Sequence, residues 1–267
     1  MELGYRNKVV GVTGAAARSG IGFAIAARFL EEGARLFICD IDEAALHKAE
    51  EELSALGEVR GFCANVADEA EVAALFDDAI RHFGCLDVFV NNAGIYPQGA
   101  LCEMDGAAWD RVMSVNLKSV FLCGCAAFRQ MRAQGGGVIL NAASYASLIP
   151  SAGSGAYAAS KAAVYSLTKT MAAEFAPFGV RVNGYIPGVI ETGMTQPLVN
   201  VKREKLENQI ALRRLGTPRD VADAVLFLGS NAASYIAGTF LEISGGKLCV
   251  QNPDYGYTRW KGELNHD

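Results

Sequence analysis

The chain has 267 residues, 51% hydrophobic and 20% charged, a composition that permits a large core and is not typical of disorder. Its net charge of −5 does not favour a nucleic-acid partner. No continuous apolar run approaches the ~20 residues that cross a bilayer, and the first residues lack the apolar segment of a signal peptide. The seven cysteines are scattered without a Cys-x-x-Cys motif, as in reduced intracellular proteins. We therefore expect a cytoplasmic globular protein that binds neither nucleic acid nor membrane.

Short apolar runs and amphipathic segments alternate along the whole chain. Apolar runs predict strands over residues 8–12, 36–39, 59–63, 86–90, 138–141, 180–185 and 240–243. Helical spacing predicts helices over residues 20–32, 43–56, 68–82, 109–132, 156–176 and 221–228. Gly33, Gly57 and Gly84 stand where glycines end helices, and Asp68 with Glu71 three residues later predicts a capping box.

Strands that are apolar on both faces and are separated by helices predict a parallel sheet covered by helices on each side. We therefore expect an α/β fold: one doubly wound, Rossmann-type domain with a seven-stranded parallel sheet. In such a domain the ligand lies at the carboxyl ends of the strands. The residues that follow each strand are thus the candidates for function.

The first predicted strand runs into a glycine-rich turn, Thr13-Gly14-Ala15-Ala16-Ala17-Arg18-Ser19-Gly20-Ile21-Gly22. Glycines at this place let a pyrophosphate approach backbone N–H groups at the start of a helix. Asp40 ends the second strand, where a carboxylate can accept hydrogen bonds from both ribose hydroxyls of an adenosine. A plain tight turn and a solvated acid are the alternatives, but position and spacing together favour a dinucleotide site.

Polar residues also follow the fourth and fifth strands. Asn91-Asn92-Ala93-Gly94 can brace the backbone beside a ligand or form a simple turn. Ser144 follows the fifth strand, and Tyr157 and Lys161 lie four residues apart on one helix face. An ammonium ~4 Å from a phenolate stabilises it by about 4 kcal/mol at an effective dielectric of ~20, enough to lower the pKa of the phenol by up to ~3 units. Such a phenol can exchange a proton with an alcohol, although each residue alone could be purely structural.

Taken together, these motifs resemble those of the short-chain dehydrogenase/reductase family over about residues 7–246. The resemblance is carried by Thr13-Gly14 with Gly20-Ile21-Gly22, Asn91-Asn92-Ala93-Gly94, Asn116, Ser144, Tyr157-x-x-x-Lys161, Pro187-Gly188 with Thr192, Gly216-Thr217-Pro218-Arg219-Asp220-Val221-Ala222, and Gly245-Gly246. It implies a NAD(P)-dependent oxidoreductase that interconverts a secondary alcohol and a ketone.

By this resemblance, four residues form the catalytic set. Tyr157 is the general acid/base, Ser144 orients the substrate oxygen, and Lys161 lowers the pKa of the tyrosine and binds the nicotinamide ribose. Asn116 interrupts its helix and holds a water that continues the proton relay. The carboxamide of the nicotinamide is held by the Ile190 backbone and the Thr192 side chain.

The resemblance also implies the cofactor contacts. They are Gly14, Arg18, Ser19, Gly20, Ile21, Asp40, Ile41, Asn65, Val66, Asn92, Ala93, Gly94, Tyr157, Lys161, Pro187, Gly188, Ile190 and Thr192. The chain departs from the family pattern in two ways: the glycine loop is two residues longer, and Asn65 stands where an aspartate is usual. Asp40 would repel a 2′-phosphate, whereas Arg18 could attract it. Because Ser19 occupies the position that is often basic in NADP-dependent members, we predict NAD rather than NADP.

Residues 1–246 are predicted to form the catalytic domain, with a substrate lid over about residues 191–214, the least regular part of the chain. Tyr96, Tyr145, Tyr185 and Met194 are predicted to line the substrate pocket. Aromatic rings with polar tips suit a sugar, a polyol or a similar small hydroxy compound. Residues 247–267 form an aromatic extension that either covers a neighbouring subunit or its active site or is a disordered tail. The resemblance suggests a homotetramer or homodimer.

Two other functions use similar motifs. A 3-oxoacyl-[acyl-carrier-protein] reductase is disfavoured by Asp40, because such enzymes usually use NADPH and need a basic surface for their acidic carrier. A non-catalytic NAD-sensing protein is disfavoured by the intact Ser144, Tyr157 and Lys161. A serine hydrolase is excluded because no Gly-x-Ser-x-Gly motif exists, and no residue cluster predicts a metal site.

Overall fold

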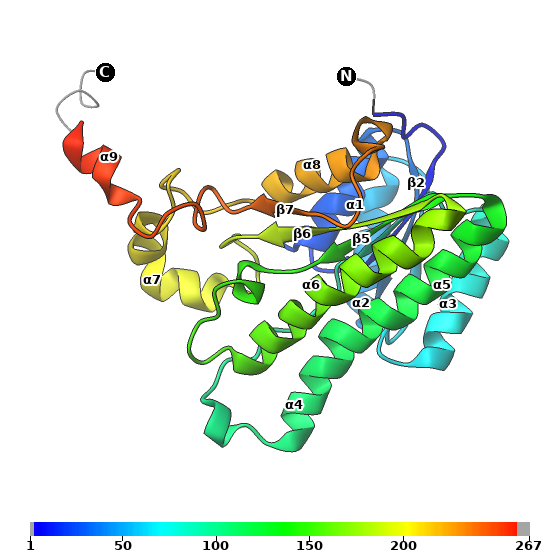
Figure 1. Ribbon diagram of the computed structural model, residues 1–267. Helices are drawn as coiled ribbons and strands as arrows, with labels where there is room; N and C mark the ends of the chain where they lie inside the picture. The colour runs from blue at the N-terminus through cyan, green and yellow to red at the C-terminus, as the bar shows by residue number, and fades with distance from the viewer. Residues whose placement is uncertain (1–2, 261–267) are drawn as a thin grey trace.

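The computed structural model describes residues 3–260 and contains a single seven-stranded sheet (Figure 1). Its strands are β1 (Val9–Thr13), β2 (Arg35–Asp40), β3 (Val59–Cys63), β4 (Val88–Asn91), β5 (Gly137–Ala142), β6 (Val180–Pro187) and β7 (Phe240–Ile243). All pairs are parallel, in the order β3-β2-β1-β4-β5-β6-β7. The predicted fold is confirmed. The chain reverses its direction of travel between β1 and β4, which is where a doubly wound sheet opens a ligand crevice.

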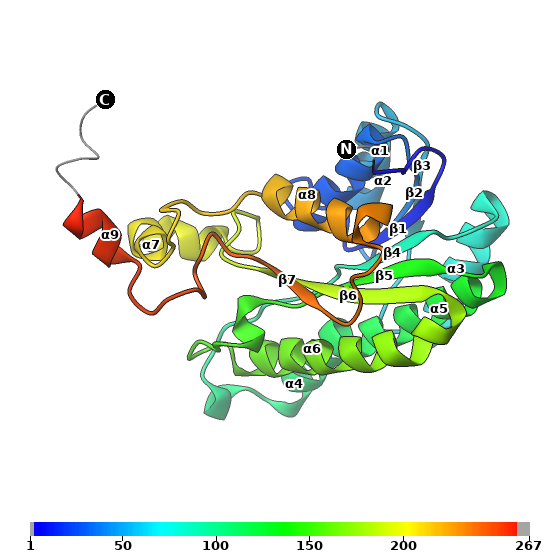
Figure 2. The ribbon, with the colours of Figure 1, turned by 45° about the horizontal axis from the view of Figure 1, so that its top comes forward.

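Helices cover both faces of the sheet (Figure 2). One face carries α1 (Ile21–Glu31), α2 (Glu43–Ser54) and α8 (Pro218–Gly229), and the other carries α3 (Glu69–Phe83), α4 (Gly106–Met113), α5 (Ser119–Gln134) and α6 (Gly155–Phe175). Alternate residues of each strand enter opposite cores: Val10 and Val12 pack with α1 and α8, while Val9 and Phe37 pack with α3 and α5. Burial on both faces is why these strands read as continuous apolar runs.

Local signals predicted both ends of α3 to within one residue, apart from one contact. Gly84, with φ of +82°, ends α3 in the left-handed conformation expected of a glycine. Asp68 caps the start of α3 by accepting from the N–H groups of Ala70 and Glu71. The predicted capping box is wrong, however, because the Glu71 carboxylate accepts from the Asn65 N–H at 2.7 Å and does not return to Asp68.

A capping box instead begins α8, formed by Thr217 and Asp220. Pro218 occupies the first turn of this helix, where its missing N–H costs nothing. The helix therefore starts three residues before the predicted start at Val221.

The long helical region predicted over residues 109–132 is continuous from Gly106 to Gln134 but changes geometry. A π-helical turn, Ser114–Lys118, separates α4 from α5. Among residues 3–260, Gly106–Gln134 is the one helical stretch long and apolar enough to cross a membrane by length and composition alone, with a hydropathy of 1.2. Half of its most apolar window is buried within the domain, where α5 packs against α3, β4 and β5.

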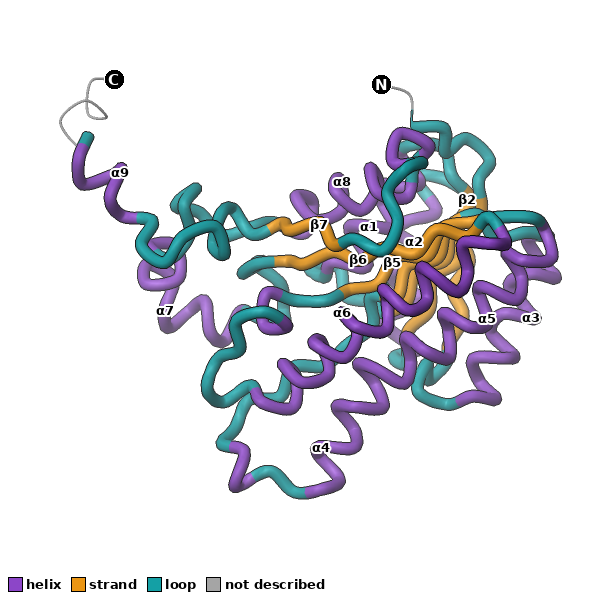
Figure 3. Tube along the Cα trace, viewed as in Figure 1, coloured by secondary structure: helices purple, strands orange, loops and turns teal. Residues whose placement is uncertain are grey.

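The predicted lid is more regular than the sequence analysis stated. Residues 196–208 form helix α7 (Gln196–Asn208), with a break at Lys202, and a short helix α9 (Asp254–Arg259) lies next to it (Figures 1 and 3). Both helices lie beyond the carboxyl ends of the strands. A separate apolar cluster holds α7 in place, consisting of Val189, Val199, Leu206, Ile210 and Leu215. The description of this segment as irregular was therefore wrong.

Candidate active site

A cleft of about 680 Å³ opens at the carboxyl ends of the strands. It is lined by every predicted cofactor residue except Arg18 and Ser19, and by Ser144, Tyr185 and Met194. Its size is in the range of pockets that hold small molecules and cofactors. The sheet thus brings together residues that lie more than a hundred positions apart in the sequence.

The glycine loop borders the cleft through Gly14 and Gly20 and packs closely against the start of α1. A Cβ on Gly22 would lie 2.2 Å from the carbonyl oxygen of Gly14, so no larger residue fits there. Asn92 braces the turn, its amide donating to the carbonyls of Thr13 at 3.1 Å and Gly14 at 3.0 Å. Gly20, the residue before α1, provides no side-chain cap, so the first N–H groups of the helix have no capping partner. A helix start of this kind suits a pyrophosphate, and the residues fit a dinucleotide.

Asp40 borders the same cleft and also supports the glycine loop. One of its carboxylate oxygens accepts from the Ala16 N–H at 3.1 Å and the other from the Ile41 N–H at 2.8 Å. Arg18, from the longer loop, pairs with Glu52 of α2 at 3.0 Å, and its side chain is 80% exposed. It therefore lies outside the cleft, contrary to the prediction.

Ser19 is likewise absent from the lining of the cleft. Its hydroxyl accepts from the Gly193 N–H at 3.3 Å, so the lengthened loop contacts the start of the lid. Ser19 thus bridges the glycine loop and the lid.

The three residues predicted to carry the chemistry meet at one end of the cleft. Tyr157 and Lys161 lie on α6, with Lys161 Nζ 5.9 Å from the centre of the Tyr157 ring. Ser144 follows β5, and its hydroxyl interacts with the Tyr157 phenol. Lys161 is buried and donates to the carbonyl of Ala142 at 2.8 Å.

The charges in this cluster differ from the sequence prediction. Burial raises the pKa of Tyr157 to about 12, although its hydrogen bond to Ser144 acts in the opposite direction. Burial also lowers the pKa of Lys161 to about 8. The prediction that Lys161 brings the pKa of Tyr157 below its ordinary value is therefore wrong for this structure. Desolvation by burial is the largest influence on the phenol, and it acts against the charged form.

Asn116 lies in the π-helical turn, as a residue that interrupts its helix should. Its amide bonds to both backbone groups of Ile95, accepting from the N–H at 2.8 Å and donating to the carbonyl at 2.9 Å. It also donates to the Ser160 hydroxyl at 3.1 Å. Asn116 therefore holds the chain after Gly94 beside Lys161. The proton-relay water assigned to it stays a prediction.

The predicted substrate residues do not all lie together. The Tyr96 ring meets the Tyr157 ring edge-on, with centres 4.7 Å apart, and Tyr145 packs against the apolar cluster of the lid. Met194 borders the cleft and is exposed. Tyr185 lines the floor of the cleft, where it is fully buried and its hydroxyl donates to Asn92 at 3.2 Å; its contact with substrate stays a prediction.

Comparison with known proteins gives the same fold and the same class of chemistry. A family model described as Enoyl-(Acyl carrier protein) reductase matches residues 14–247. Cis-4-hydroxycyclohexanecarboxylate dehydrogenase of Sinomonas cyclohexanicum is 40% identical, over 92% of this chain and 98% of that protein. The 3-oxoacyl-[acyl-carrier-protein] reductase FabG of Thermotoga maritima is 40% identical, over 90% of this chain and 97% of that protein.

Solved structures of dehydrogenases have the same fold as this chain. A short-chain type dehydrogenase/reductase from Mycobacterium marinum has a TM-score of 0.89 at 33% identity, over 93% of this chain and 98% of that chain. NAD⁺-bound xylitol dehydrogenase has a TM-score of 0.87 at 31% identity, over 91% of this chain and 100% of that chain. The chain belongs to the short-chain dehydrogenase/reductase family. It is an oxidoreductase that acts on alcohol groups with NAD or NADP.

Several residues of this dehydrogenase that line the cleft were missed by sequence reasoning. They are Ala17, Cys39, Ala64, Ala67, Ile95, Arg111, Ser114, Val115, Ala142, Ala143, Gly193 and Thr195. Most of them adjoin a predicted residue in the chain and could have been found from that neighbourhood. Arg111 comes instead from the end of α4 and Ser114 from the start of the π-helical turn, and no local signal connects either residue to the glycine loop.

The C-terminal extension packs on the lid of its own chain. Arg213 pairs with Asp254 of α9 and lies 4.4 Å from the centre of the Tyr257 ring. The Tyr257 hydroxyl donates to the carbonyl of Ala211 at 2.7 Å. The described part of the extension is therefore ordered against the lid, whereas coverage of a neighbouring subunit stays a prediction. Residues 261–267 lie outside the described part of the chain.

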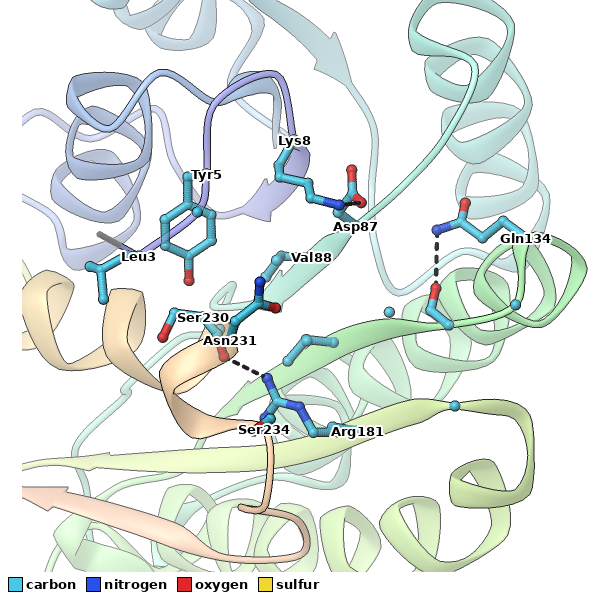
Figure 4. Close-up of a pocket in the computed structure, with 17 residues that line it drawn as sticks. Leu3, Tyr5, Lys8, Asp87, Val88, Gln134, Arg181, Ser230, Asn231 and Ser234 are labelled. Atoms are coloured by element: carbon cyan, nitrogen blue, oxygen red, sulfur yellow. Dashed lines mark hydrogen bonds and ion pairs between the residues drawn. The ribbon is translucent and has the colours of Figure 1, made fainter. Parts of the chain in front are cut away.

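A second cavity, of about 380 Å³, lies at the opposite edge of the sheet (Figure 4). Lys8 and Asp87 point toward one another there and pair at 2.8 Å. Arg181 donates to the carbonyls of Leu228, Ser230 and Ile236. These charged groups already join separate elements of the fold, and the cavity contains none of the predicted site residues.

Proposed function

We propose that this protein is a NAD-linked dehydrogenase that interconverts a secondary alcohol and a ketone in a small hydroxy compound, with Tyr157 as the general acid/base. The observation that carries the proposal is the meeting of Tyr157, Ser144 and Lys161 at one end of a cleft whose other end has a glycine loop. When bound, the nicotinamide ring supplies the acceptor or donor of the hydride. The protein has to bind the substrate oxygen and move its proton.

The geometry suits that division of tasks. Ser144 and Tyr157 can both hydrogen-bond to one substrate oxygen, because their hydroxyls already interact with each other. With a pKa of about 12, the Tyr157 phenol carries its proton at neutral pH and is ready to give it to a ketone oxygen. Oxidation of an alcohol needs the phenolate, so the same group has to release its proton before it can act as the base.

The test is the variant Tyr157→Phe, which removes only the hydroxyl. We expect turnover to fall by about 100-fold or more, since general acid–base catalysis contributes typically 10²–10⁴-fold. Binding of NADH, followed by its fluorescence, should be unchanged.

Tyr165 and Lys169 provide a matched control. They repeat the same spacing on α6, with Lys169 Nζ 4.6 Å from the ring, but Tyr165 stacks on Phe240 away from the cleft. Tyr165→Phe should retain activity. Equal turnover by the wild type and Tyr157→Phe would refute the proposed role.

The preference for NAD rests on charges near the adenosine end of the cleft. Asp40 borders the cleft, while Arg18 is paired with Glu52 and lies outside it. A 2′-phosphate would therefore meet a carboxylate without a cation from the glycine loop. The measurement is kcat/KM for both cofactors, and equal or better use of NADP would overturn this preference.

For the substrate, we propose a sugar, a polyol or a similar small hydroxy compound, supported by Tyr96 beside Tyr157 and by the likeness to xylitol dehydrogenase. The second candidate is a 3-oxoacyl-[acyl-carrier-protein] reductase, favoured by the FabG relative. A screen of polyols, aldoses, hydroxy acids and 3-hydroxyacyl thioesters separates the two. Faster turnover of the thioesters, together with use of NADPH, would favour the second candidate.

We also propose that the protein assembles as a homotetramer or homodimer. The support is the family resemblance and the exposure of large apolar side chains on α4 and α5, with Trp109 37% and Phe121 50% exposed. Sedimentation in the ultracentrifuge measures the assembly directly, and a monomer at micromolar concentration would contradict the proposal.

A further inference from the structure

Lys247 lies beside Tyr145, the residue that follows the catalytic Ser144, and beside the lid. It follows the Gly245-Gly246 turn after β7. Its Nζ is 5.3 Å from the centre of the Tyr145 ring and donates to the side-chain oxygen of Gln209 at 3.0 Å. Tyr145 directly follows Ser144 and packs against the apolar cluster of the lid. The ammonium is therefore fixed between the lid and the tyrosine next to the catalytic serine.

Lys247 differs from the arginines of the lid in its charge partners. The three arginines of the lid segment each pair with a carboxylate: Arg203 with Glu191 and Glu207, Arg213 with Asp254, and Arg214 with Asp220. Lys247, in contrast, has no carboxylate within ion-pair distance among residues 3–260.

Lys247 is also partly withdrawn from water. It is half-buried, and burial alone shifts its pKa downward, with no acid acting against that shift. A half-buried cation without a counter-charge is unfavourable, and an anion that reaches it gains a charge-assisted hydrogen bond. The aromatic face of Tyr145 and the amide of Gln209 fix the ammonium without neutralising it.

We propose that Lys247 binds an anionic group of the substrate, so that the preferred substrates are small hydroxy or keto compounds that carry a carboxylate or a similar anion. This inference rests on the proposed function, because it assigns the substrate class of the same site. Tyr157 and Ser144 would hold the reacting oxygen while Lys247 holds the far end of the molecule. A substrate bound at both ends would present one face of its carbinol carbon to the nicotinamide. This role would also explain why Gln209, the hydrogen-bond partner of Lys247, lies in the lid.

The experiment compares hydroxy acids with their own amides, which are of the same size but neutral. The probes are 3-hydroxybutyrate, 4-hydroxycyclohexanecarboxylate and gluconate, each paired with its carboxamide, with NAD reduction as the readout. For at least one pair we expect kcat/KM to favour the acid by about tenfold or more, the size expected for a hydrogen bond to a charged group. Lys247→Met should abolish this preference by raising KM for the acid, with kinetics on the amide unchanged. Lys247→Arg should keep most of it.

Lys205→Met is the matched control, because Lys205 lies on α7 and is exposed. It should leave the preference intact. The inference would be overturned if the wild type turned over acids and amides at equal rates, or if Lys247→Met lowered kcat/KM equally for both. Either result would leave the proposed function standing. That second result would mean that Lys247 only fixes the lid through Gln209. A wild type that reduced NAD with none of these acids and amides, and with no polyol and no thioester either, would refute the proposed function, and this inference with it.

Discussion

Replacing Lys161 by methionine should make the protein more stable while removing its activity. Lys161 is 4% exposed, and its Nζ has the carbonyl of Ala142 as its partner. Burial lowers the pKa of this ammonium from 10.5 to about 8, so the folded protein holds the charged form less well than the unfolded chain does. Methionine has a similar length and carries no charge.

The size of the effect follows from the pKa. A shift of ~2.5 units corresponds to roughly 3 kcal/mol against folding with the lysine charged. Loss of the hydrogen bond to Ala142 offsets about 1 kcal/mol of that gain. Lys161→Met should thus raise the free energy of unfolding by about 2 kcal/mol at pH 7, or the melting temperature by roughly 4–8 °C.

The pH dependence has a definite sign. Because the folded-state pKa is lower than the unfolded one, the penalty is fully present below pH 8. It diminishes as the pH rises from about 8 toward 10.5, where the unfolded chain also loses its proton. The advantage of Lys161→Met should therefore be largest at pH 7 and nearly absent at pH 10.

The assay is thermal unfolding of the wild type and the variant at pH 7 and pH 10. Lys169→Met serves as the control, since Lys169 lies over a tyrosine ring on the same helix but is exposed. It should change the melting temperature little at either pH. A Lys161→Met protein that is less stable than the wild type, by the same amount at both pH values, would refute the reasoning.

Two further predictions concern the glycine loop and the extension. Gly22→Ala should abolish NADH binding, measured by fluorescence, because the new Cβ would lie 2.2 Å from the carbonyl oxygen of Gly14. Gly106→Ala is the control, since nothing lies within 4 Å of its new Cβ, and this variant should bind NADH normally. Removal of residues 253–267 breaks the pair between Arg213 and α9, and should raise KM for the alcohol several-fold while leaving KM for NAD unchanged. Unchanged values for both substrates would show that the extension does not position the lid.

The sequence predicted those features that depend on local pattern. Strands β3 and β7 have the predicted bounds. The spacing of Tyr157 and Lys161 placed both on one helix face, and the parallel sheet then brought Ser144 to the same edge. Such features follow from helix and strand periodicity alone.

Features that depend on which side chains meet in space were not predictable in this way. The Glu71 carboxylate bonds to Asn65 and not to its expected partner, and Arg18 turns to Glu52 and away from the cleft. Helix α7 was missed because few apolar residues mark it, although Val199 and Leu206, seven residues apart, do lie on its buried face. In each case a residue distant in the sequence, or the packing of the domain, determined which contact formed, and the local sequence allowed the alternatives equally well.

The double attachment of Asp40 bears on any attempt to re-engineer the coenzyme choice of this enzyme. Substituting a basic residue would remove the repulsion of a 2′-phosphate, but it would also release the N–H groups of Ala16 and Ile41. The glycine loop would then lose an anchor at the same time as its ligand is changed. A change of preference from NAD to NADP would therefore need two substitutions. Position 40 would need a neutral side chain that still accepts hydrogen bonds from the loop, and a cation for the 2′-phosphate would have to come from another position.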